Sequence, residues 1–294
     1  MSKNKLINQL PAIGAILIFL ILCGLYLSEI KILNALPFTT EKIIEEIKPF
    51  DILIGLTIYL KTSIDFALLI GTLMSKYKGL KNRFAIEIGT ALGNALGTFT
   101  ILGVWVFFKE VKWLLAIMVI FASLVLFEMA KTSIEHLEET DHDQKDQVSV
   151  KPWQKQFANL INSFLNPILK VIGPVVSKVL PNLSFQEGDD NKTKSFWGLI
   201  LTSFTIPFIL GLDDFAGYVP LFNTVNVFGF GVGVFLGHCI LNLFLFLNPD
   251  ATTRIIKNPI IALLGSLAFI ILACYGLYEG GHLLLGVFGL FGKH

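Results

Sequence analysis

Leu212-Asp213-Asp214-Phe215-Ala216 lies inside an apolar run in the second half of the chain, and Ser63-Ile64-Asp65-Phe66-Ala67 has the matching place in the first half. In each half the next apolar run carries glycines at four-residue spacing, which allows helix backbones to approach closely. These glycines are Gly89, Gly93 and Gly97 in the first half and Gly229, Gly233 and Gly237 in the second. The third run of each half contains a related tripeptide, Leu126-Phe127-Glu128 or Leu277-Tyr278-Glu279. Landmarks that recur in one order predict an internal repeat of three runs.

The apolar runs are long enough to cross a membrane. Mean hydropathy is +0.70 and charged residues make up 15% of the chain, against about 25% in soluble domains. A helix of roughly 18 or more mostly apolar residues spans a bilayer, and about seven runs come close to or exceed this length: 11–26, 52–74, 84–108, 111–133, 196–222, 227–247 and 260–278. We expect an all-α integral membrane protein with two three-helix repeats and one N-terminal transmembrane helix. A signal peptide is the alternative for the first run, but no small-residue cleavage site follows it.

Three spans is an odd number, so the second copy must enter the membrane from the opposite face. This is the inverted-topology repeat of many secondary transporters, which place their binding site near the middle of the membrane. The chain then divides into five parts. They are 1–50, an N-terminal transmembrane anchor and outer linker; 51–134, the first repeat; 135–195, a cytoplasmic acidic linker and interfacial amphipathic helix; 196–282, the second repeat; and 283–294, a C-terminal tail.

Basic residues predict the orientation and the contact with lipid. The short loop 76–83 carries four Lys or Arg residues, so we expect it, together with the N-terminus, on the cytoplasmic side of a plasma-membrane protein. Within 152–180, apolar residues recur at three- and four-residue spacing among lysines, which is typical of an amphipathic helix on anionic lipid. Thr40 is expected to cap a short helix that carries Ile43, Ile44 and Ile47. The net charge of +1 argues against a nucleic-acid partner, and an oligomer of the chain is left open.

Acidic side chains inside the spans point to a site. A carboxylate at the centre of a span costs about 2.5–3.5 kcal/mol on insertion scales, so Asp65, Asp213 and Asp214 need a compensating role. Lys61 is the nearest basic residue, and a structural salt bridge with it is the alternative. The segment 207–211, which begins with proline and ends with glycine, predicts either a broken helix that exposes carbonyl groups or a simple kink.

The residues near these acids suit a divalent cation, because such ions accept oxygen ligands and the softer ones accept imidazole. Thr62 and Ser63 supply hydroxyl groups beside Asp65, and the glycine-lined spans add one amide and one imidazole at matching positions. The predicted metal ligands are Asp65, Asp213, Asp214, Asn94 and His238. For His238 a proton relay or a packed, hydrogen-bonded core histidine stays open. The candidate gate or proton-relay residues are Glu128 and Glu279, for which ordinary interfacial placement is the alternative.

The two acidic segments resemble the LysE superfamily of exporters, which includes the CadD-type cadmium-resistance transporters, the TerC family and manganese exporters. Asp214-Phe215-Ala216-Gly217-Tyr218-Val219-Pro220-Leu221-Phe222 is similar to the CadD-type segment in which an aspartate is followed shortly by Tyr-x-Pro-Leu-Phe. Ser63-Ile64-Asp65 is similar to that family's Asn-Ile-Asp. The resemblance covers the two repeats and implies export of divalent metal ions, with Asp65 and Asp214 as the shared acidic positions. Phe66 and Phe215 depart from the acidic or amide residues of the CadD type.

Two functions therefore compete. The first is export of a divalent metal cation of the manganese, cadmium or zinc class, with exchange for protons as the coupling, and the metal ion is then a substrate and no cofactor is expected. The second is export of amino acids or other small organic solutes on the same scaffold, which the scarcity of fixed positive charge in the spans disfavours. An enzyme is not expected, because the sequence contains no GxSxG or HExxH motif and no paired-histidine haem pattern.

Overall fold

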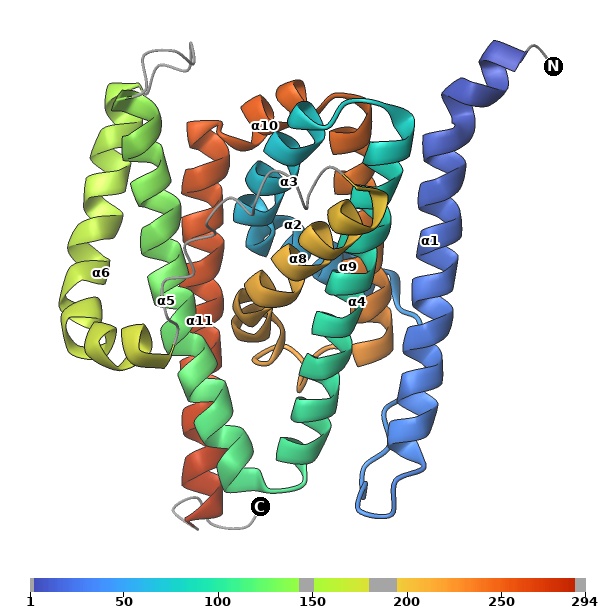
Figure 1. Cartoon of the computed structure of the whole chain (residues 1–294). Coiled ribbons are helices and arrows are strands. Elements are labelled where there is room, and N and C mark those ends of the chain that lie inside the picture. The colour runs from blue at the N-terminus through green and yellow to red at the C-terminus, as the bar shows by residue number, and fades with distance from the viewer. Residues whose placement is uncertain (1–2, 143–150, 180–194, 289–294) are drawn as a thin grey trace. The chain divides into compact units, whose positions relative to one another are not determined.

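The computed structural model describes residues 3–142, 151–179 and 195–288, and within these ranges every regular element is a helix (Figure 1). In chain order the helices are α1 (Lys3–Asn34), α2 (Pro49–Thr62), α3 (Ile64–Lys76), α4 (Leu80–Lys109), α5 (Lys112–His142), α6 (Pro152–Val179), α8 (Phe196–Tyr218), α9 (Val227–Leu247), α10 (Pro249–Ile256) and α11 (Pro259–Val287). The expected all-α class is therefore confirmed.

Five of the described helices, α1, α4, α5, α9 and α11, are long and apolar enough to cross a membrane. Helices α2 and α3 form a sixth crossing if they are counted as one broken span, with a bend of 67° between them. The protein is thus a multi-pass membrane protein, and the count of seven spans stays a prediction. Of the two alternatives at 207–211, the broken helix is excluded because α8 continues through Pro207, and the simple kink stays open. The sharp bend lies instead between α2 and α3.

The short helix expected after Thr40 is absent from the described segment 39–48, which is irregular. The Asn34 side chain explains this difference, because its amide nitrogen donates to the Ile43 carbonyl oxygen at 2.9 Å and its amide oxygen accepts from the Ile43 N–H at 2.7 Å. These are the backbone groups that a helix through Ile43 would use for its own hydrogen bonds. The segment is therefore held against the end of α1 without forming a helix.

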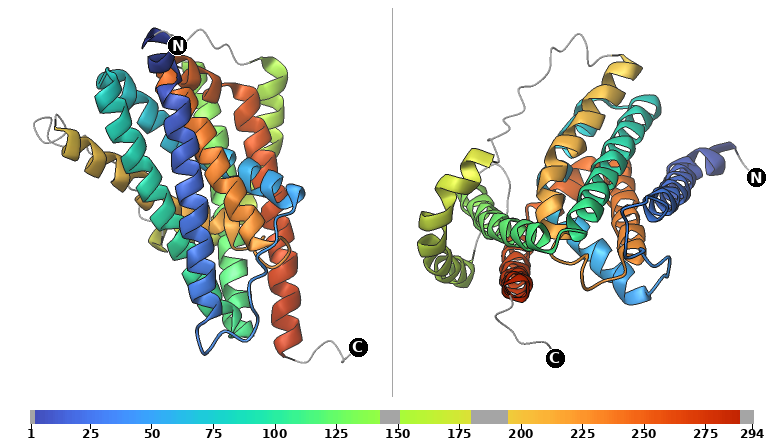
Figure 2. Two further views of the ribbon diagram at one scale, coloured as in Figure 1. Left: turned by 90° about the vertical axis from the view of Figure 1, so that its right-hand side faces the viewer. Right: turned by 90° about the horizontal axis from the view of Figure 1, so that it is seen from below.

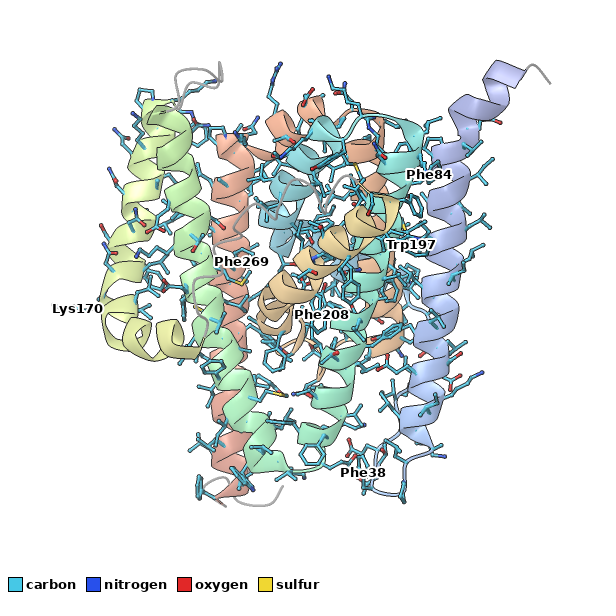
Figure 3. The ribbon with its side chains drawn as sticks, in the orientation of Figure 1. Phe38, Phe84, Lys170, Trp197, Phe208 and Phe269 are labelled. Atoms are coloured by element: carbon cyan, nitrogen blue, oxygen red, sulfur yellow. The ribbon has the colours of Figure 1, made fainter. Side chains whose placement is uncertain are left out.

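The chain folds as two compact units, and the first consists of Met1–Glu110, Glu187–Asp214 and Phe222–Thr253. Helix α9 is its centre and contacts α1, α2, α3 and α4 (Figure 2). Helix α1 docks through Tyr26, which is fully buried over Gly231 and donates its hydroxyl proton to the Val227 carbonyl oxygen at 3.3 Å. Phe84 of α4, labelled in Figure 3, packs on Phe246 with ring centroids 4.9 Å apart.

Glycines in α4 and α9 permit the closest helix contacts of this unit. A side chain at Gly89 or Gly93 of α4 would come within 3.0 Å of a backbone carbonyl oxygen of α8, at Ile200 or Phe204 respectively. In α9, a side chain at Gly233 would meet the Ile52 carbonyl oxygen in the same way, and Gly237 lies against Leu56 and Tyr59 of α2. The helix-contact role that the glycine spacing predicts is confirmed in both halves.

The second unit consists of Val111–Gln186, Phe215–Leu221 and Arg254–His294. Helices α5 and α11 lie side by side in it, with Gly276 against Ser123 and Gly280 against Ile120 (Figure 1). The small side chains at these contacts allow the two backbones to approach closely.

Helix α6 is amphipathic as predicted, and it packs along α5. One face of α6 is buried, at Ile161, Leu165 and Leu169. The ring centroid of Phe164 lies 6.4 Å from that of Phe127 in the apolar part of α5. Figure 3 shows Lys170 on the side of α6 away from α5. Lipid contact of α6 stays a prediction.

The two units cut across the division predicted from the sequence. The first unit holds α2, α3, α4, α9 and most of α8, whereas the second holds the third long helix of each predicted repeat, α5 and α11. Two boundaries also differ, because α5 continues into the predicted linker 135–195 as far as His142, and α11 continues into the predicted tail 283–294 as far as Val287.

Candidate functional site

The bend between α2 and α3 positions the first candidate group. Ser63 ends α2 with φ −89° and ψ 17°, and the Thr62 hydroxyl donates to the Asp214 carboxylate of α8 at 2.5 Å. A donor–acceptor distance of about 2.5–2.7 Å is typical of a hydroxyl bound to an ionised carboxylate. The end of a helix also leaves carbonyl groups without their usual intrahelical partners. The bend therefore brings a carboxylate of α8 against a hydroxyl group at the end of α2, while the carbonyl oxygens of Tyr59 and Ser63 accept from the Ser63 and Ala67 N–H groups.

Asp65 lies on the first turn of α3, three residues after Thr62. The backbone turn that carries Asp65 therefore lies near the Asp214 carboxylate. The side chains of Asp65 and Asp213 lie outside the described part of the structure. Among the described residues, no group of three or more His, Cys, Asp or Glu side chains could hold a metal ion. The full predicted ligand set stays a prediction.

The half-buried Lys61 precedes Thr62 at the same bend. Lys61 is therefore next in sequence to the residue that binds the Asp214 carboxylate. In a low-dielectric environment a positive charge nearby stabilises the ionised form of a carboxylate and also competes with a bound cation. Lys61 consequently matters both for a metal site and for a site that takes a zwitterion.

A second polar group forms around His238, in the core of the first unit. Tyr59 Oη lies 2.7 Å from His238 Nδ1, and Asn242 Nδ2 lies 3.0 Å from His238 Nε2 and 2.9 Å from Thr90 Oγ1. All four side chains are at most 2% exposed. The network joins α2, α4 and α9, which are three of the helices in this unit.

The hydrogen bonds determine where the protons of this network lie. The single proton of the Thr90 hydroxyl goes to the Glu87 carbonyl oxygen at 2.9 Å, so Thr90 Oγ1 must accept from Asn242. Asn242 therefore directs its NH₂ group at both Thr90 and His238, and Nε2 of the histidine is the acceptor. A neutral imidazole has one donor and one acceptor nitrogen, so the His238 proton lies on Nδ1 and is donated to Tyr59.

These contacts favour the core-histidine alternative for His238. A metal ligand needs a free lone pair on nitrogen, and in this structure the Nε2 lone pair accepts from Asn242 and Nδ1 carries the proton. Asn94 is 3% exposed, and its Nδ2 atom has no hydrogen-bond partner among the described residues. The structure thus connects His238 to Tyr59, Thr90 and Asn242, which the sequence did not single out. The four-residue spacing of His238 and Asn242 on one helix was the only available signal.

Glu128 and Glu279, the candidate gate residues, both belong to the second unit and are half-buried. Gly280 of α11 lies against Ile120 of α5, so Glu279 is level with that part of α5 and eight residues from the level of Glu128. At 1.5 Å per residue the two carboxyl groups are offset by about 12 Å along the helix pair. They do not form a single gate with each other.

Comparisons of this chain with protein-family models, with curated proteins and with solved structures found no match.

Proposed function

We propose that this protein is a secondary transporter that exports a divalent metal cation of the manganese, cadmium or zinc class, with Asp65 and Asp214 as the central ligands. One observation carries the proposal: the Asp214 carboxylate meets Thr62 at a 67° bend, on the turn that leads to Asp65. Broken helices inside a membrane supply carbonyl oxygens and helix ends to bound ions in many secondary transporters. Carboxylate, hydroxyl and carbonyl oxygens are ligands that hard and borderline divalent cations accept.

The helix contacts support the inverted repeat on which alternating access would rest. Pairing Asp65 with Asp214 maps Ile200 and Phe204 of α8 onto Asp51 and Gly55 of α2. The glycines of α4 contact Ile200 and Phe204, and the matching glycines of α9 contact residues 52 and 56, one position from the mapped ones. The glycine-lined helix of each half therefore packs on the first helix of the other half, α4 on α8 and α9 on α2. Two copies related by a twofold axis would make this reciprocal pair of contacts.

A second candidate is the export of an amino acid or another small zwitterion. The half-buried Lys61 at the bend favours it, because an amino acid needs a cationic partner for its carboxylate and an anionic one for its ammonium group. Metal export is the preferred hypothesis because Asp65 adds a second acid at the same turn, and because the two acidic segments resemble those of metal exporters.

Growth of a sensitive host separates the two functions. Cells that express the chain are challenged with manganese, cadmium, zinc and toxic amino-acid analogues, with metal accumulation measured in parallel. We expect protection against one or more metals, lost in Asp65→Asn and Asp214→Asn and retained in Asp250→Asn. Asp250 is a matched control, because its carboxylate accepts a hydroxyl proton from Ser75 at 2.6 Å outside the bend. Protection against an analogue alone, unchanged in the two aspartate variants, would contradict metal transport.

A further inference from the structure

One face of α4 carries buried polar atoms that have no hydrogen-bond partner among the described residues. They are Glu87 Oε2, Asn94 Nδ2 and Thr98 Oγ1, on side chains that are 2%, 3% and 2% exposed. Their spacings of seven and four residues place them on one side of the helix. Most buried polar groups in proteins are hydrogen-bonded, and exceptions point to bound water, an ion or a functional role.

Helix α9 adds a fourth such atom at the same contact. Asn242 joins α4 at Thr90, one turn from Glu87 in one direction and one turn from Asn94 in the other. The proton of Thr90 fixes its amide, so Asn242 Oδ1 is left as a buried acceptor without a partner in the described structure. The contact therefore holds the Glu87 carboxyl group and a spare acceptor on Asn242, whereas the spare donor on Asn94 lies two turns further along α4.

One cationic side chain lies near Glu87. Arg83, one turn earlier on α4, donates to the Phe246 carbonyl oxygen of α9, and its buried Nε has no hydrogen-bond partner among the described residues. No ion pair joins Arg83 to Glu87 in the described structure. The other titratable groups near Glu87 are His238 and Cys239 on α9 and Cys23 on α1. Helix α8 contributes Ser203 to its contact with α4, and a serine hydroxyl does not titrate near neutral pH. His238 is neutral in the observed network. An ionised carboxylate buried without a counter-ion is costly, whereas the protonated acid is not.

We propose that Glu87 is the carboxyl group that takes up and releases the coupling proton of the transport cycle. This inference rests on the proposed function, for which it names the coupling ion. The protonated acid supplies a donor for the acceptor on Asn242, directly or through water, and is stable in the buried state. On release the O–H bond breaks, the proton passes to water, and the carboxylate accepts hydrogen bonds from the entering water. Thr98 extends the hydrated face toward the other end of α4.

The test uses the full-length protein in proteoliposomes with an imposed manganese gradient. Proton movement is followed with an enclosed pH-sensitive dye, and manganese–manganese exchange is followed with a radioactive tracer. In Glu87→Gln we expect at least a tenfold loss of metal-driven proton flux with exchange within twofold of the wild type, and a partial return of proton flux in Glu87→Asp. Glu45→Gln, which removes an exposed carboxylate, should match the wild type. Wild-type proton flux in Glu87→Gln, or loss of exchange in that variant, would overturn the inference.

Infrared difference spectroscopy keeps the test decisive even if the reconstituted protein moves no metal, which would refute the proposed function. A pH step should produce a carbonyl-stretch band of a protonated buried carboxyl group in the wild type and in Glu45→Gln, but not in Glu87→Gln. The same band in Glu87→Gln would show that another acid titrates, and the assignment to Glu87 would then be wrong. Thermal unfolding of each variant in detergent checks that it is folded.

Discussion

The Thr62–Asp214 hydrogen bond and the Tyr59–His238–Asn242–Thr90 network are the residue-scale features on which the site depends. The first joins an acid of one half to the bend of the other, and the second holds three helices together through fully paired imidazole nitrogens. Both lie in the first unit. At this scale the stability of the network can be tested separately from transport.

Thr90→Val removes the hydroxyl group that accepts from Asn242 while keeping the shape of the side chain. We expect a loss of about 1–3 kcal/mol of stability, because a buried amide N–H is then left without its acceptor. The unfolding midpoint in detergent should fall accordingly. Thr100→Val is the matched control, since the exposed Thr100 hydroxyl on the same helix donates only to the Leu96 carbonyl oxygen. Equal midpoints for the two variants would contradict a structural role for the network.

The acids of the site could be predicted from the sequence, whereas the hydroxyl and amide partners could not. A charged residue in an apolar run is conspicuous, which is why Asp65 and Asp214 were found. Tyr59 and Thr90 are ordinary in membrane helices, and only the rotation of each helix about its axis decides which of them faces His238. Asn242 belongs to the same class. Apart from the glycine positions, nothing in the sequence indicates how each helix is rotated about its axis.

At the scale of elements, the glycine contacts hold α2 against α9. Gly233→Ala would bring a methyl group within 3.0 Å of the Ile52 carbonyl oxygen, so we expect strong destabilisation and a lower yield of folded protein. A side chain at Gly103 meets nothing within 4 Å, and Gly103→Ala should be neutral or stabilising by up to about 1 kcal/mol because alanine favours the helix. Unfolding midpoints of both variants check this difference.

The segment after α1 is anchored to the α4–α5 turn by Glu110, whose carboxylate accepts from the Thr40 hydroxyl at 2.6 Å and from the Thr40 N–H at 3.2 Å. These bonds lower the pKa of Glu110 below the ordinary value of a glutamate. A group with a lowered pKa in the folded state stabilises it above its unfolded pKa, and this contribution is lost as the pH falls through the folded value. The anchor should thus hold at neutral pH and fail only below the ordinary pKa of glutamate.

A spin label at Glu45→Cys, in a background without the native cysteines, reports this anchor. We expect restricted label motion at neutral pH that increases as the solution is acidified below the ordinary pKa of glutamate. In Glu110→Gln the motion should already be increased at neutral pH and should respond little to acid. Identical pH profiles in the two proteins would show that Glu110 does not hold the segment.

The predicted and observed helix ends agree closely where a capping residue defines the end. The run predicted at 227–247 coincides with α9, because the Asn226 side chain accepts from the Gly229 N–H and Asn248 ends the helix. The bend at Ser63 was not predicted, since serine is compatible with a helix and no proline or glycine marks the position. At Pro207 the sequence left a broken helix and a simple kink open, and α8 continues through the proline, which excludes the broken helix.

At the scale of the whole molecule, the orientation of the helices is the open prediction. Leu80→Cys at the start of α4 and Asn223→Cys before α9 are both exposed positions in the structure. With the native cysteines replaced, we expect a membrane-impermeant maleimide to label Asn223→Cys in intact cells and Leu80→Cys only after permeabilisation. Labelling of both from one side would contradict the inverted repeat. The all-α class and the membrane character followed directly from hydropathy, whereas the partition into two units depends on side-chain packing that hydropathy does not record.

Equilibrium binding of manganese, cadmium and zinc to the purified protein tests the central claim most directly. The account predicts saturable binding of at least one of these ions, weakened tenfold or more in Asp65→Asn and in Asp214→Asn and unchanged in Asp250→Asn, whose carboxylate is bonded to a hydroxyl group away from the bend. Binding that survives both aspartate variants, or no binding of any of the three ions to the folded wild-type protein, would contradict it.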